Sequence, residues 1–70
     1  MRLFQLLHAE TEGTIVCLVR RVADGYEMRL ICDGSTQCRL RCRSLADALK
    51  LANRWQTTLS RNGWRSAAIQ

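Results

Sequence analysis

In the stretch TIVCLVRRVADGYEMRLICDGSTQCRLRC, residues 14–42, apolar and polar residues alternate along most of the length. A period of two residues is typical of strands with one buried face. The pairs Asp24-Gly25 and Asp33-Gly34 are strong turn signals, so the stretch divides into three antiparallel strands joined by hairpins. The predicted strands are Thr14–Val22, Tyr26–Cys32 and Gln37–Arg43.

The predicted register follows from these turns. A two-residue turn at Asp24-Gly25 sets Cys17 opposite Cys32, and directly opposed residues share a face. An odd-length loop after Asp33 is needed to keep the apolar sets on one face, so Cys38 is also set opposite Cys32. The sequence thus predicts one apolar row of three cysteines across the sheet.

The last of these strands has the sharpest division between its faces. Three arginines alternate with two cysteines and a leucine, and a strand places alternate side chains on opposite faces. The apolar side is predicted to lie beneath a helix and to consist of Cys38, Leu40 and Cys42. The arginines then lie on the opposite side of the sheet, which we call the open face.

The N-terminal segment, residues 1–9, has two interpretations. Paired about Glu12-Gly13 it forms a fourth strand, with Phe4, Leu6 and His8 on the apolar face and His8 opposite Cys17. Its leucines also allow the start of a helix.

A C-terminal helix is predicted more directly. Ser44 is a suitable N-cap, with Asp47 three residues later in the manner of a capping box. Apolar residues follow at helical spacing up to Asn62-Gly63, where glycine favours the end of a helix. Trp64 is expected to pack back on the last turn, and residues 65–70 to form a short strand or to fray. The fold class is therefore α+β: an antiparallel meander of three to four strands with one C-terminal helix packed on one face.

Length and composition place further bounds on the protein. The 70 residues form one small α+β domain, and the net charge of +5 arises from eleven Lys and Arg against six Asp and Glu. A basic balance favours polyanionic partners or serves solubility. No segment has a signal-peptide core or the length of a membrane span, so we expect a cytoplasmic protein with reduced cysteines and no membrane role.

The open face suggests two binding functions. Alternating arginines present guanidinium groups about every 6.8 Å, a spacing suited to a chain of phosphates. Nucleic-acid binding would use Arg20, Arg29, Arg39, Arg41 and Arg43. The alternative is a protein-interaction module that forms a homodimer through the apolar part of the same face, because a contiguous exposed apolar patch usually marks a contact surface. That part consists of Leu3, Leu7, Val16, Leu18 and Ile31. A third interpretation is a solvated face that protects an edge strand from aggregation.

Enzymatic and metal-binding functions are not indicated. The spacing of Cys38 and Cys42 on one strand separates their side chains by about 13 Å, too far to share a zinc ion. Cys17 with His8 is the one Cys-His pair that this register brings together, and both face the helix. We therefore predict no catalytic residue, no metal, no cofactor and no small-molecule substrate.

The predicted order, four strands followed by one helix over most of the chain, is similar to that of small single-strand-binding domains of the PUR type. Those domains usually form dimers. The similarity is one of strand order and assigns no role to any residue, but it favours the nucleic-acid interpretation.

Overall fold

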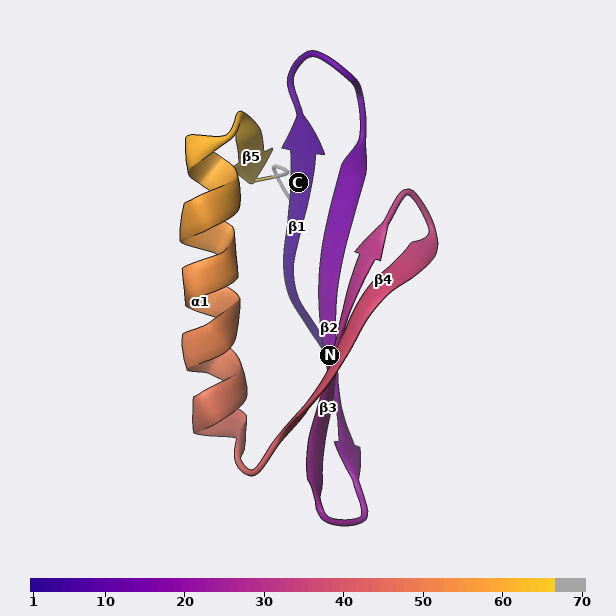
Figure 1. Ribbon diagram of the computed structural model, residues 1–70, viewed down its shortest axis with the longest axis vertical. Helices are drawn as coiled ribbons and strands as arrows, with labels where there is room; N and C mark the ends of the chain where they lie inside the picture. The colour runs from indigo at the N-terminus through magenta and orange to yellow at the C-terminus, as the bar shows by residue number, and fades with distance from the viewer. Residues whose placement is uncertain (67–70) are drawn as a thin grey trace.

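The computed structural model describes residues 1–66 and shows an antiparallel sheet packed against one helix (Figure 1). The elements are β1 (Arg2–His8), β2 (Thr14–Val22), β3 (Gly25–Cys32), β4 (Ser35–Cys42), α1 (Leu45–Arg61) and β5 (Trp64–Ser66). The strand order is β4-β3-β2-β1-β5. The predicted α+β class is confirmed, and the N-terminal segment is a strand. The sheet has five strands because the chain after α1 returns to pair with β1; the remainder of the predicted tail, residues 67–70, lies outside the described residues.

The helix begins and ends where its capping residues predict. The Ser44 hydroxyl accepts a hydrogen bond of 3.1 Å from the Asp47 N–H, which satisfies one free donor of the first turn. Asn62 is the C-cap, and Gly63 follows with a φ of +92°. No helix among residues 1–66 combines the length and the apolar character that crossing a membrane requires.

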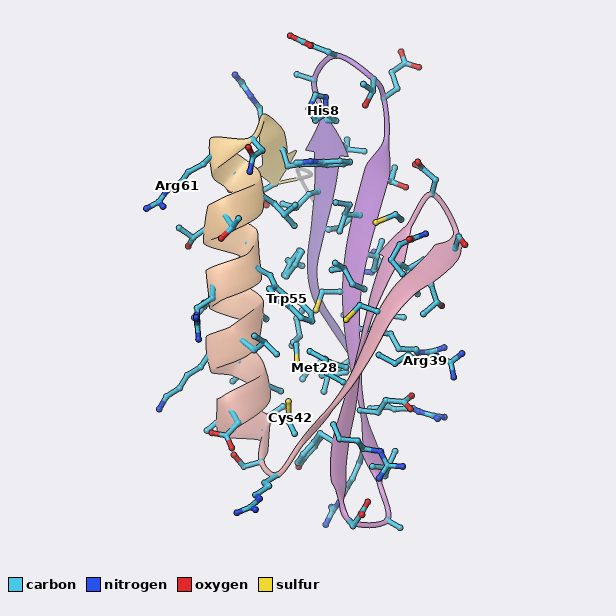
Figure 2. The ribbon with its side chains drawn as sticks, in the orientation of Figure 1. His8, Met28, Arg39, Cys42, Trp55 and Arg61 are labelled. Atoms are coloured by element: carbon cyan, nitrogen blue, oxygen red, sulfur yellow. The ribbon has the colours of Figure 1, made fainter. Side chains whose placement is uncertain are left out.

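The core lies between α1 and one face of the sheet. Met28 points from the sheet toward the helix, and Trp55 points from the helix toward the sheet (Figure 2). Among residues 1–66, eight apolar residues are buried, six from the first three strands and two alanines from the helix. Small residues on the helix let it approach the sheet closely. The buried residues are Phe4, Leu6, Ile15, Cys17, Val19, Met28, Ala48 and Ala52.

The register between β2 and β3 differs from the predicted one by two residues. Cys17 pairs with Leu30 instead of Cys32, and the turn residues are Ala23-Asp24, because Gly25 already belongs to β3. A shift of two preserves the face of every side chain. Gly25 is required in the strand because a Cβ there would lie 2.5 Å from the backbone oxygen of Cys42.

The turn between β3 and β4 is shorter than predicted. Asp33 and Gly34 form it, both with the positive φ that a type I′ turn demands, and Cys32 pairs with Ser35. The apolar pattern still requires one extra residue in β4. Gln37 supplies it as a bulge between the pairs Leu30–Cys38 and Ile31–Thr36. Cys38 therefore lies opposite Leu30, and the predicted row of three cysteines is wrong.

The pairing of β1 with β2 also corrects two predictions. The connecting loop is longer, so Phe4 rather than His8 lies opposite Cys17. A bulge between Arg2 and Phe4 turns Leu3 toward the core, where it packs against the buried residues instead of joining the open face.

Leu40 is less buried than predicted. Its exposed fraction is 39%, and its neighbours Cys38 and Cys42 are half-buried. Strand β4 begins far from α1 and approaches the helix only at its carboxyl end (Figure 1). The helix therefore covers the middle of the sheet better than this edge.

Gly25 in β3 and Gly34 in the β3–β4 turn provide a test of the packing. We expect Gly25→Ala to lower the free energy of unfolding by about 2–4 kcal/mol, because the new Cβ meets the Cys42 backbone oxygen. Gly34 has a φ of +83°, and nothing lies within 4 Å of the position that a Cβ would take. Gly34→Ala should therefore lower the free energy of unfolding by only about 1–2 kcal/mol, through backbone strain alone. Urea unfolding measures both, and an equal loss in the two variants would contradict the close approach of β4 to Gly25.

Candidate nucleic-acid interface

The open face is the side of the sheet that α1 does not cover, and Arg39 points away from the helix there (Figure 2). Cross-strand pairing arranges its side chains in rows that run across the sheet. The rows are Arg20, Glu27 and Arg41; Arg2, Leu18, Arg29 and Arg39; and Gln5, Val16, Ile31 and Thr36. Four of the five predicted arginines thus lie in two adjacent rows. Arg43 is exposed just beyond the end of β4.

Three of these arginines are in ion pairs. Glu27 Oε1 lies 3.0 Å from Arg20 Nε and 4.0 Å from Arg29 Nε. At the neighbouring turn, Arg41 Nη1 donates to Asp24 Oδ1 over 2.6 Å. The Arg41–Asp24 pair is exposed on both sides, and pairs of this kind contribute at most about 1 kcal/mol. In the Arg20–Glu27 pair the arginine is exposed but the carboxylate is largely covered.

Arg29 and Arg39 form the most unusual pair on this face. They are direct cross-strand partners, so two guanidinium groups share one position of the ladder. Like charges placed directly opposite each other destabilise a sheet. Glu27 compensates the Arg29 side from 4.0 Å, whereas Arg39 makes no ion pair within residues 1–66. The pair therefore places two like charges on neighbouring strands with one carboxylate beside them.

The structure adds Arg2, which sequence reasoning missed. The bulge in β1 sets Arg2 opposite Leu18 on the open face, where its guanidinium donates to the Gln5 side chain over 2.8 Å. Strict alternation along β1 hides this position, because one extra residue reverses the faces before it. The sequence gives no turn or glycine signal for such a bulge.

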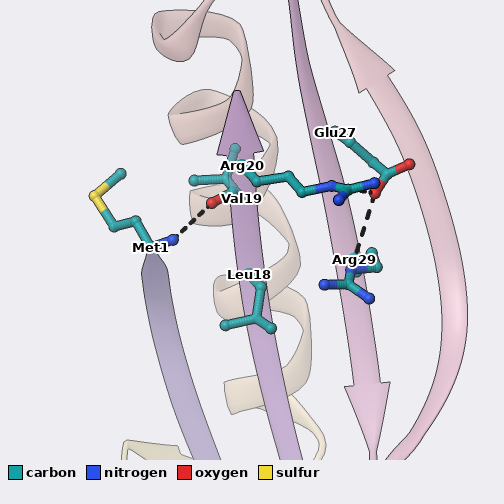
Figure 3. A pocket seen from close by; sticks show the side chains of 6 residues that line it. All are labelled: Met1, Leu18, Val19, Arg20, Glu27 and Arg29. Atoms are coloured by element: carbon teal, nitrogen blue, oxygen red, sulfur yellow. Dashed lines mark hydrogen bonds and ion pairs between the residues drawn. The ribbon is translucent and has the colours of Figure 1, made fainter. Parts of the chain in front are cut away.

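Apolar side chains lie among the charged ones. Val16, Leu18 and Ile31 are half-buried in the middle of the sheet, and Leu7 is 43% exposed near β5. A hollow of about 80 Å³ opens beside Leu18, with Arg20 and Arg29 on its rim (Figure 3). It is lined by Met1, Leu18, Val19, Arg20, Glu27 and Arg29. The apolar patch is thus narrow and bordered by guanidinium groups.

The predicted register brings His8 opposite Cys17, but the structure separates them. The His8 ring lies edge-on to Trp64 at a centroid distance of 5.0 Å. Its Nδ1 accepts a hydrogen bond from the Glu10 N–H, and its Nε2 contacts the backbone carbonyl oxygen of Asn62. Burial raises the pKa of the Cys17 thiol to about 11, and Cys38 adds to the effect. A protonated, buried thiol is a poor nucleophile, so Cys17 is a core residue.

The other cysteines do not assemble a metal centre with their neighbours. Within residues 1–66, no three His, Cys, Asp or Glu side chains converge closely enough to hold an ion. Cys42 instead contacts the Met28 sulfur at 3.5 Å, at the margin of the core.

Comparisons with models of protein families, with curated proteins and with solved structures found no match to this chain. The similarity in strand order to PUR-type domains gains no support from them. The function must therefore be inferred from the open face itself.

The arginine pair has a measurable cost. At low salt we expect Arg39→Gln to raise the free energy of unfolding by about 0.2–1 kcal/mol, because it removes a like-charge cross-strand contact. The gain should shrink at high salt, where exposed charges are screened. Arg61→Gln, at the exposed end of α1, is the matched control and should show no such gain. A destabilised Arg39→Gln at low salt would contradict the repulsion.

We expect the protein to lose stability in alkali because the Cys17 thiol is buried. Its pKa rises from 9.0 to about 11 on folding, so the unfolded chain loses this proton first as the pH rises. Below about pH 9 the thiol is protonated in both states, so its ionisation does not change the stability. Between about pH 9 and 11 the free energy of unfolding should fall as the pH rises. Cys17→Ala should be less stable throughout but should lose less of that stability over this interval. An unchanged pH dependence in the variant would exclude Cys17 as its source.

Proposed function

We propose that this protein binds nucleic acid through the phosphate backbone, with the open face as the contact surface. The observation that carries the proposal is the direct pairing of Arg29 with Arg39, beside further guanidinium groups in the same and the adjacent row. Arginine binds phosphate through paired N–H donors, which suits a face whose rows hold arginine as their one kind of basic residue within residues 1–66. Arg2, Arg20, Arg41 and Arg43 extend the surface along and beyond the central pair.

The aromatic residues favour backbone binding over base stacking. Phe4 is buried, and Tyr26, Trp55 and Trp64 pack against the core on the helix side of the sheet. Binders that stack bases need exposed aromatic platforms. Within residues 1–66 the open-face rows hold none, so we expect weak sequence preference and strong salt dependence.

Self-association through the same face is the alternative proposal. Leu7, Val16, Leu18 and Ile31 support it, whereas Leu3 now belongs to the core side. A stable interface buries about 800 Å² on each partner, far more than this narrow patch provides, so it would also include the arginines. Two copies stacked face to face would then bring like charges together. Sedimentation tests the alternative: a dimer that Val16→Lys converts to a monomer would favour it.

Fluorescence anisotropy with short labelled single- and double-stranded DNA tests the main proposal. We expect the triple variant Arg39→Gln, Arg41→Gln, Arg43→Gln to lose at least about tenfold in affinity at low salt, because each phosphate contact releases a counterion. The matched control changes Lys50, Arg54 and Arg61 to Gln on the exposed helix surface, with the same loss of charge. It should lose much less.

The comparison separates a local surface from net charge. Equal losses in the two triple variants would mean that binding follows overall charge and has no particular face. No binding of the native chain at low salt would refute the proposal.

A further inference from the structure

Glu27 occupies a position unlike that of any other acidic residue of the chain. The other five acids lie in the loop and turns between strands or in the first turn of the helix, whereas Glu27 is the third residue of β3 and lies on the open face. Its cross-strand partners are Arg20 on one side and Arg41 on the other. A single carboxylate is therefore surrounded by the arginines of the proposed binding surface.

The contacts of Glu27 explain what it does in the free protein. One oxygen, Oε1, lies 3.0 Å from Arg20 Nε and 4.0 Å from Arg29 Nε, so guanidinium groups of two strands converge on it (Figure 3). The Glu27 side chain is only 14% exposed, whereas that of Arg20 is 62% exposed. The carboxylate thus lies low among the arginine stems, while the guanidinium of Arg20 remains accessible to solvent.

A carboxylate and a phosphate offer guanidinium the same kind of acceptor: charged oxygens that take N–H donors. An anion that approaches Arg20 or Arg29 therefore competes with Glu27 for donors and is also repelled by its charge. By contrast, Asp24 lies at the end of a hairpin, where it contacts Arg41 alone and is itself exposed.

We propose that Glu27 is an internal counter-ion that limits the affinity of the open face for nucleic acid. This inference rests on the proposed function. In the free protein the carboxylate compensates Arg20 and Arg29; in the complex a phosphate takes over part of that role. Glu27 therefore sets how many phosphates the face neutralises, and its removal makes one further phosphate contact available.

Two effects of removing the carboxylate oppose each other. Loss of the ion pair frees the Arg20 and Arg29 side chains, which lowers their pre-organisation. The gain is the absence of a negative charge within a few ångströms of the incoming phosphate. Arg20 is 62% exposed, so its ion pair holds it only weakly, whereas the largely covered Glu27 carboxylate is little screened by solvent. The charge effect therefore dominates. We expect Glu27→Gln to bind about three- to tenfold more tightly at low salt.

The salt dependence gives a second readout that a purely structural role would not change. The slope of log K against log salt concentration should steepen by about 0.9 for duplex DNA or about 0.7 for a single strand, as one more phosphate is neutralised. The control is Glu10→Gln, which makes the same charge change in the β1–β2 loop, away from the arginine rows. It should leave the slope unchanged and the affinity within about twofold.

The experiment is anisotropy with short labelled DNA, single- and double-stranded, over a series of salt concentrations. Tighter binding and a steeper slope in Glu27→Gln, but not in Glu10→Gln, would support the inference. If the native chain binds and Glu27→Gln binds equally or less tightly, the inference is overturned while the proposed function stands. If neither binds at low salt, both fail. Should Glu27→Gln not fold, Glu27→Thr, a neutral residue suited to strands, takes its place.

Discussion

The burial of Met28 is the constraint on which the candidate interface depends. This side chain is fully buried beneath α1, and a strand alternates its side chains between two faces. Glu27 and Arg29 must therefore point to the side that the helix leaves uncovered. The same rule acts on β2 and β4, where burial of Val19 and partial burial of Cys38 turn Arg20 and Arg39 the same way. The charged rows are thus a geometric consequence of the core.

The fold tolerates this arrangement at a cost. A sheet stabilised only by its own contacts would place opposite charges or β-branched residues at the Arg29–Arg39 position, because direct like-charge partners are unfavourable. Glu27 and Asp24 reduce the cost for three of the arginines, and the apolar core offsets the remainder. A surface that forgoes stability in this way is typical of sites selected for binding.

The sequence predicts faces better than partners. The register between β2 and β3 differs from the predicted one by two residues, so Cys17 pairs with Leu30 instead of Cys32. Because two is an even number, every predicted face of β2 and β3 is still correct. Apolar alternation determines the face, whereas the number of residues in a turn depends on contacts such as that between Gly25 and Cys42, which come from a distant strand. Bulges have no such signal: the one in β1 moved Leu3 to the core side and brought Arg2 to the open face. Glu27 was predictable as an open-face residue, but its two arginine contacts needed the register.

We propose above that an anionic backbone binds at the Arg29–Arg39 pair. Nuclear magnetic resonance of the arginine Nε–Hε groups, during titration with a short DNA strand at low salt, tests it most directly. We expect the signals of Arg29 and Arg39 to shift first and furthest, and those of Arg54 and Arg61 on the helix to remain nearly unchanged. Larger shifts on the helix than on the open face, or no shift at any arginine, would contradict it.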